Sequence, residues 1–127
     1  MTHARLVCFA LLVLLLVACA NTPTFTQQTA SYTVTLSFDA LAVGDRSVTV
    51  EVRDSAGPVD TATVTLTPTM LSMGMASPEA VAKSVGNGRY TSDAVLLSMV
   101  GDWELDVLIE RGGTSETARF LFAVAAQ

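Results

Sequence analysis

Alternation of apolar and polar residues with a period of two is the feature that most constrains how this chain folds. The segments "YTVTLSF" from Tyr32, "SVTVEVR" from Ser47 and "WELDVLIE" from Trp103 place apolar side chains at every second position. Such alternation is typical of strands that turn one face to a core and the other to water. No stretch shows a sustained helical period with capping residues, so the chain is predicted to be all-β.

Three further segments, "TATVTLT", "AVAKSVG" and "ARFLFAV", alternate in the same way, and in "AVAKSVG" Val81 and Val85 share one face. Turn signals such as "DSAGP", "GNGR" and "RGGT" separate the segments. About seven short strands of this kind predict an immunoglobulin-like antiparallel β-sandwich over residues 32–127. The predicted core contains Val50, Val64, Leu66, Trp103, Leu105, Val107, Phe120 and Phe122.

The N-terminus is predicted to be a lipoprotein signal peptide over residues 1–18. Its apolar run, residues 6–17, is too short for a stable membrane span and fits a signal-peptide core. "LVAC", ending at Cys19, resembles a bacterial lipobox, in which the cysteine thiol receives a diacylglyceryl group. We therefore expect a mature protein that is lipid-anchored at Cys19 on the extracytoplasmic side of the cell membrane, in the periplasm or at the cell exterior. Ordinary secretion with cleavage near Ala18 or Ala20 is the alternative.

Residues 19–31 are expected to be the lipidated cysteine and a tether. The stretch "ANTPTFTQQTAS" is polar and rich in Thr and Gln, and twelve flexible residues would reach about 20 Å. The only other cysteine, Cys8, lies in the leader. The mature domain should therefore have neither a disulfide nor a free thiol.

Charge and histidine content exclude several classes of function. Of seven Lys and Arg residues, Arg5 lies in the leader, so six face twelve Asp and Glu and the mature net charge is about −6. This balance argues against nucleic-acid binding, which needs clustered cations. The single histidine, His3, also lies in the leader. Histidine-based catalysis and imidazole sites for Zn²⁺ or Cu(II) are thereby excluded from the domain, and we expect no enzyme.

Methionine is the residue type that points to a function. Met70, Met73 and Met75 lie in "MLSMGM", and Met99 lies in "SMVGDW". Prolines 68 and 78 bracket the first cluster, so we expect a long connection between strands there. Thioether sulfur suits Cu(I), and these four residues are the candidate metal ligands. Methionine also fills irregular core gaps beside aromatic rings such as Trp103, and it suits adaptable contacts with a protein partner.

Five motifs taken in order, "VEVRDSAGPVDTATVTL", "MLSMGM", "GNGRY", "LLSMVGDWEL" and "RFLFAV", resemble the YtkA-like domain family, which is related to FixH-like domains. The resemblance covers about residues 32–125. It implies an immunoglobulin-like sandwich outside the cytoplasm and suggests copper handling or support of membrane-complex assembly. Copper-handling relatives often mix His with Met near this loop, whereas this chain has no His there. This departure from the family pattern argues against a Cu(II) site and leaves only a thioether Cu(I) site, with docking on a membrane-protein partner as the alternative function.

Overall fold

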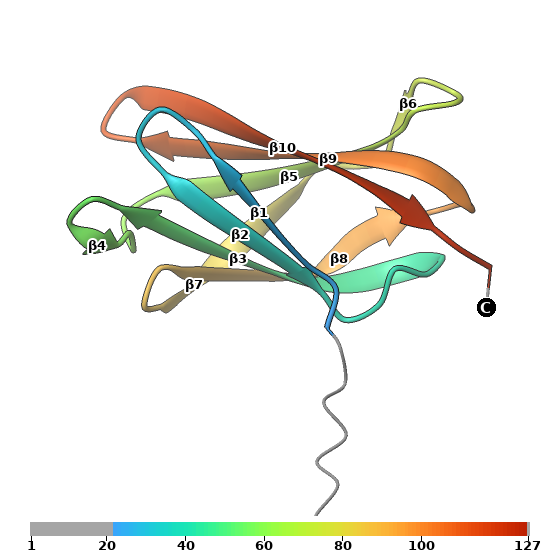
Figure 1. The fold of residues 1–127 in the computed structure, drawn as a ribbon, viewed down its shortest axis with the longest axis horizontal. Coiled ribbons are helices and arrows are strands. Elements are labelled where there is room, and N and C mark those ends of the chain that lie inside the picture. The colour runs from blue at the N-terminus through green and yellow to red at the C-terminus, as the bar shows by residue number, and fades with distance from the viewer. Residues whose placement is uncertain (1–21, 127) are drawn as a thin grey trace, which may run out of the picture.

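Backbone pairing arranges the chain in two antiparallel layers that meet at a shared strand (Figure 1). The structure is a computed structural model, and it describes residues 22–126. Its strands are β1 (Thr24–Gln28), β2 (Thr33–Phe38), β3 (Gly44–Asp54), β4 (Gly57–Pro58), β5 (Thr63–Met70), β6 (Met75–Ala76), β7 (Ala80–Gly86), β8 (Arg89–Leu97), β9 (Gly101–Arg111) and β10 (Thr114–Val124).

The pairing order along both layers is β1-β2-β3-β8-β7-β5-β9-β10, and the short strands β4 and β6 pair with β3 and β5. β7 pairs with β8 in the first layer and with β5 in the second, so it joins the layers along one side. The predicted all-β antiparallel sandwich is confirmed. The predicted number of about seven strands is too low. The six alternating segments correspond to β2, β3, β5, β7, β9 and β10, whereas β1, β4, β6 and β8 lie outside them.

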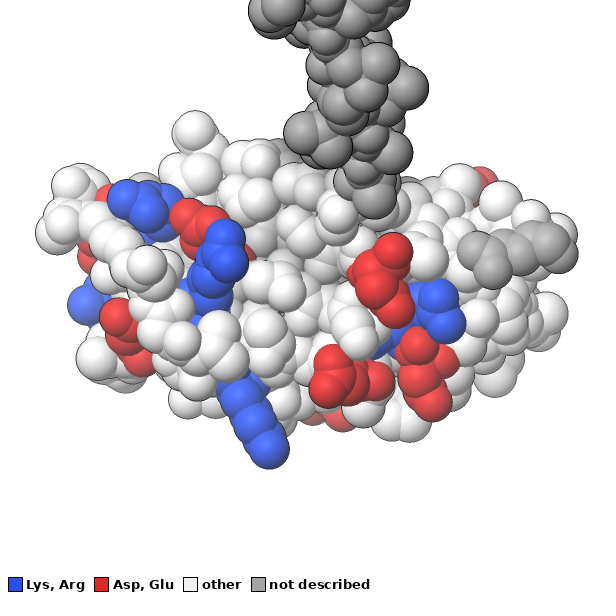
Figure 2. All heavy atoms as spheres, turned by 90° about the horizontal axis from the view of Figure 1, so that it is seen from below, with Lys and Arg blue, Asp and Glu red and all other residues white. Residues whose placement is uncertain are grey.

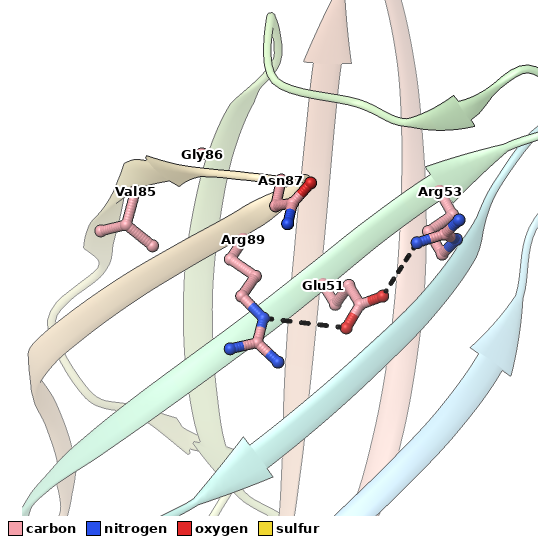
Figure 3. A pocket seen from close by; sticks show the side chains of 6 residues that line it. All are labelled: Glu51, Arg53, Val85, Gly86, Asn87 and Arg89. Atoms are coloured by element: carbon pink, nitrogen blue, oxygen red, sulfur yellow. Dashed lines mark hydrogen bonds and ion pairs between the residues drawn. The ribbon is translucent and has the colours of Figure 1, made fainter.

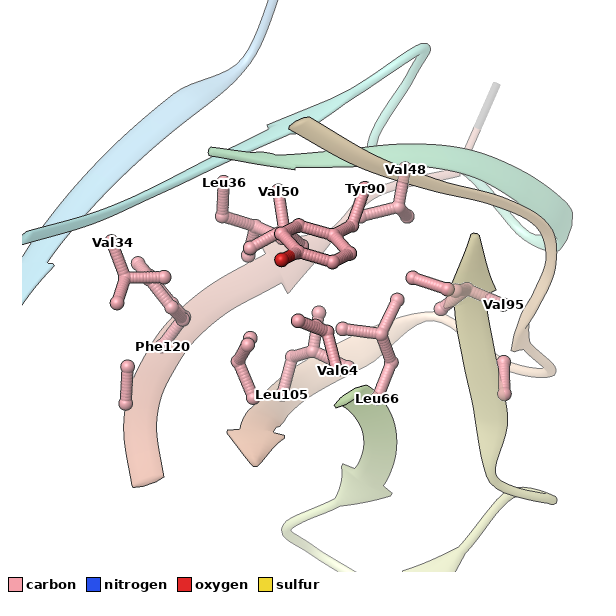
Figure 4. Packing of buried hydrophobic residues seen from close by; sticks show 14 of the residues in the cluster. Val34, Leu36, Val48, Val50, Val64, Leu66, Tyr90, Val95, Leu105 and Phe120 are labelled. Carbon is pink, nitrogen blue, oxygen red and sulfur yellow. The ribbon is translucent and has the colours of Figure 1, made fainter. Parts of the chain in front are cut away.

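The space between the layers is filled by the inward faces of the alternating segments (Figure 4). Every residue of the predicted core is buried. Tyr90 places its ring in the same core, donates its hydroxyl to the carbonyl of Val59 at 2.6 Å, and accepts the amide of Ala62 at 3.2 Å. These bonds satisfy the one polar group that the ring brings into the interior.

The expectation of a tether is wrong for Thr24–Gln28, which forms the edge strand β1. Threonine hydroxyls across β1 and β2 lie within hydrogen-bond distance, as with Thr26 and Thr35 at 3.3 Å. Phe25 packs against Phe38 and Phe122, with ring centroids 6.4 and 6.1 Å away. A polar, threonine-rich segment thus pairs as a strand, because threonine suits an edge position and one aromatic ring reaches the core.

The expected long connection from Pro68 to Pro78 is also wrong, because β5 continues through Pro68 to Met70 and turns back as β6. The carbonyl of Pro68 accepts the amide of Ser77 at 2.8 Å. The nitrogen and carbonyl of one strand residue point to the same side, so the missing N–H of Pro68 also points away from β9. The proline therefore removes no hydrogen bond between β5 and β9.

On β7 the buried face is the alanine face. Ala80 and Ala82 are buried opposite Leu66 and Val64 of β5, whereas Val81 and Val85 are exposed. Because β7 joins the two layers, we infer that little room remains on its inner side, and a methyl group fills it. At this junction the small volume of alanine thus matters more than the greater hydrophobicity of valine.

The predicted signal peptide, residues 1–18 with Cys8, and the predicted lipidation site Cys19 lie outside the described residues. Within residues 22–126 no helix has the length and apolar character needed to cross a membrane.

Candidate methionine-rich binding site

Two segments far apart in the sequence meet at one end of the sandwich. One is the tip of the β5–β6 hairpin, residues 71–74, which projects from the body in Figure 1. The other is the connection from β8 to β9, residues 98–100. Pairing of β5 with β9 brings them together by placing Met70 opposite Trp103. We call the region formed by residues 70–75 and 98–103 the methionine end.

Met70 and Trp103 form the buried base of the methionine end. Met70 is 6% exposed and Trp103 is 1% exposed. The indole Nε1 donates to the carbonyl of Met99 at 2.9 Å, which ties the β8–β9 connection to the core. A Cβ added to Gly101 would lie 3.1 Å from Cε of Met70, so glycine gives the methionine its room. For Met70 the core-filling interpretation therefore holds.

The other three predicted ligands lie at the surface. Met73 is 55% exposed, Met75 is 60% exposed and Met99 is 46% exposed. Met75 lies directly opposite Met70 across β6 and β5, so both side chains project from the same face of the sheet. It is exposed because β6 has only two residues and extends past the core. The four predicted ligands thus divide into one core residue and three accessible thioethers.

Apolar side chains without donor atoms accompany these methionines. Leu71 and Val100 are exposed beside them. A surface hollow of about 410 Å³ adjoins the hairpin, and it is lined by Leu71, Asp102, Trp103, Leu121, Phe122 and Ala123. Sequence reasoning missed this hollow, because its walls come from three segments that only the β5–β9–β10 pairing brings together.

Ionisable groups elsewhere form surface ion pairs. Glu104 and Asp106 share Arg119, at 3.2 and 2.9 Å. The hydrogen bonds that Arg119 donates to Asp106 raise the pKa of the guanidinium. At the opposite end of the sandwich, the pKa of Asp54 is lowered, first by the amide of Ala56 and then by the side chain of Arg111. The carboxylate pair on β9 is therefore a solvated outer face that is balanced by an arginine.

A polar pocket of about 420 Å³ lies near the β7–β8 turn (Figure 3). Glu51 stands between Arg53 at 3.5 Å and Arg89 at 4.0 Å. Figure 2 shows cationic and anionic side chains mixed on the face that it presents, without a continuous basic stripe. Within residues 22–126 no group of three or more His, Cys, Asp or Glu side chains is placed to hold a metal ion. The accessible thioethers are the soft donors that the methionine end offers.

Comparison with protein families adds an independent finding. The sequence matches the YtkA-like family over residues 26–107, a range that begins in β1 and contains Met70, Met73, Met75, Met99 and Trp103. A search of curated proteins gave no match. The matched range is more than half of the chain, and the chain therefore belongs to the YtkA-like family.

Proposed function

We propose that this protein is a non-enzymatic, lipid-anchored binding module on the extracytoplasmic side of the cell membrane, and that its methionine end binds Cu(I). The observation that carries the proposal is the exposure of Met73, Met75 and Met99 on two segments that β5–β9 pairing holds at one end. Membership of the YtkA-like family supports a binding module. The lipobox-like "LVAC" supports the anchor.

The donor set selects the metal. Thioether sulfur is soft and neutral, which suits Cu(I) and disfavours Zn²⁺, Ca²⁺ and Mg²⁺. Met70 is not among the proposed ligands, because its side chain is packed on Gly101 and buried. The proposed Cu(I) ligands are therefore Met73, Met75 and Met99.

Competition titration of the lipid-free domain with Cu(I) is expected to show binding that the Met73→Leu, Met75→Leu double variant loses. Leucine keeps the apolar volume, so the free energy of unfolding of the double variant should lie within about 1.5 kcal/mol of the wild-type value. Neutral thioethers do not titrate, so the affinity should stay nearly constant from about pH 5 to 8, where a histidine site would weaken on protonation.

Met70→Leu is the matched control, since it removes a thioether from the same hairpin and the same face but at a buried position. This variant is expected to bind Cu(I) as the wild type does. Equal binding by the wild type and the double variant, or no binding by either, would exclude the copper site.

A second candidate function is docking on a membrane-protein partner through the same end. The exposure of Leu71 and Val100, which offer no metal-binding atom, favours this candidate. Methionine side chains adapt their shape to a partner surface. The absence of Cu(I) binding in the titration would leave docking as the better-supported function.

The anchor is tested by Cys19→Ala. The unmutated protein is expected to fractionate with membranes, whereas the variant should remain unprocessed or appear in the soluble fraction, because two or more acyl chains are what make anchoring stable. Mass spectrometry of the N-terminus checks the modification directly. Soluble, unacylated protein from the unmutated gene would contradict the proposed anchor.

A further inference from the structure

The chain enters the sandwich at the same end that carries the methionines. β1 begins at Thr24, which pairs with Ser37 near the end of β2. Gly44, at the start of β3, pairs with Leu97, directly before the β8–β9 connection. On the other layer Val124 pairs with Gly101. Phe25, next to Thr24, packs on Phe122 with ring centroids 6.1 Å apart, and Phe122 pairs with Trp103. The start of β1 and the methionine end therefore lie at one end of the domain.

Only four residues separate Cys19 from Thr24. Fully extended, the five Cα-to-Cα steps between these two residues cover at most about 18 Å. The headgroup layer of a bilayer takes up about 5–7 Å of that length. The start of β1 can therefore lie no more than about 12 Å beyond the headgroups, a gap less than half the roughly 30 Å diameter of a small folded domain.

Side-chain character differs between the two ends of the sandwich. Nine large hydrophobic side chains are exposed within residues 22–126, and six of them lie at the end where β1 begins. These six are Val43, Leu71, Met73, Met75, Met99 and Val100. Arg53, Arg89 and Arg111 lie at the opposite end, near the β3–β4, β7–β8 and β9–β10 turns. Asp39, Asp45 and Asp102 also lie at the end where β1 begins, together with the cation Arg46. These groups favour a zwitterionic surface over an anionic one.

We propose that the methionine end faces the bilayer that holds the anchor and lies against its zwitterionic headgroup layer. The proposal rests on the lipid anchor at Cys19 but not on Cu(I) binding. Exposed Met, Leu and Val side chains contact the headgroup layer, while the arginine-rich end points toward the aqueous phase. The short N-terminal segment leaves no room for a soluble folded protein to reach the methionine end.

The test compares thiol labelling at the two ends of the full-length, lipidated protein in phosphatidylcholine vesicles. Val100→Cys places a thiol at the methionine end, and Ser115→Cys places one at an exposed position of β10 near the opposite end. Cys19 carries lipid and does not react. A bulky polyethylene-glycol maleimide is expected to modify Val100→Cys several-fold more slowly than Ser115→Cys. Inserting about twelve Gly and Ser residues before Thr22, which adds roughly 20 Å of average reach, should abolish the difference.

Equal labelling at the two positions in vesicle-bound protein would overturn the proposed orientation and leave the anchor intact. A difference that survives the insertion would also overturn it, because the protection would then come from the fold itself. Protein that fails to float with the vesicles would overturn both the anchor and the orientation. Because the vesicles contain no other protein, slow labelling at Val100→Cys that the insertion reverses assigns the contact to lipid.

Discussion

Replacing Trp103 with alanine is expected to lower the free energy of unfolding by about 3–5 kcal/mol, out of the roughly 5–15 kcal/mol that a domain of this kind has. The ring is 1% exposed and packs at the base of the methionine end beside Met70. The substitution also removes the donor that holds the Met99 carbonyl at 2.9 Å. Urea unfolding of the variant and the wild type measures the difference.

Two further variants separate the contributions of Trp103. Trp103→Phe keeps much of the buried ring but loses the Nε1–H donor, so it should cost less than Trp103→Ala and show the contribution of the hydrogen bond, about 1 kcal/mol. Leu121→Ala changes an exposed residue on neighbouring β10 and should stay within about 0.5 kcal/mol of the wild type. A cost below about 1 kcal/mol for Trp103→Ala would contradict the view that this ring closes the core.

Gly88→Ala is expected to destabilise the domain by about 2–5 kcal/mol. Gly88 has a φ of +73°, which costs an alanine about 1–2 kcal/mol. A Cβ at this position would also lie 2.6 Å from the carbonyl oxygen of Val52. That neighbour is backbone, so the strand must shift, and such overpacking adds about 1–3 kcal/mol. The shift would disturb the hydrogen bond from the Val52 amide to the Gly88 carbonyl at 2.8 Å.

Gly113→Ala is a matched control for Gly88→Ala. Gly113 has a similar φ of +79°, but a Cβ there would meet no atom within 4 Å. Gly113→Ala should lower the free energy of unfolding only by the cost of a positive φ at alanine, about 1–2 kcal/mol. The difference between the two variants in urea unfolding isolates the contact between the β7–β8 turn and β3. Equal costs would show that this close approach does not restrain the turn.

The alternation in the sequence was sufficient to predict six of the strands and most of their inward faces, but not β8, whose buried residues Tyr90, Val95 and Leu97 do not alternate regularly. A strand residue points to the opposite face from its neighbours whatever the strand pairs with, so Val50, Leu105 and Phe120 were assigned to the core correctly. The same logic failed for β7, where Val81 is exposed and Ala82 is buried. There the separation of the two layers, which no local pattern encodes, decided which face fits inside.

β1 and β6 were missed because their segments are polar or interrupted by turn residues. Thr24–Gln28 is a strand because β2 offers it a partner and because Phe38 and Phe122 receive Phe25. Pro68 is tolerated within β5 because its nitrogen points away from β9. In both places the pairing partners and the packing around the strand overrode the local signal.

The sequence by itself determined the all-β class, the inward faces of most of the main strands and the chemistry of the candidate site. Its single histidine, His3, lies before residue 22, so soft neutral sulfur is the distinctive donor of the described domain. Only the tertiary structure decided which methionines are accessible. Met70 and Met75 lie five positions apart on either side of one hairpin turn, yet Met70 is buried beside Trp103 while Met75 is exposed. The physical reason is that a side chain's burial depends on which strands stand beside it, and β9 covers Met70, whereas β6 extends past the core.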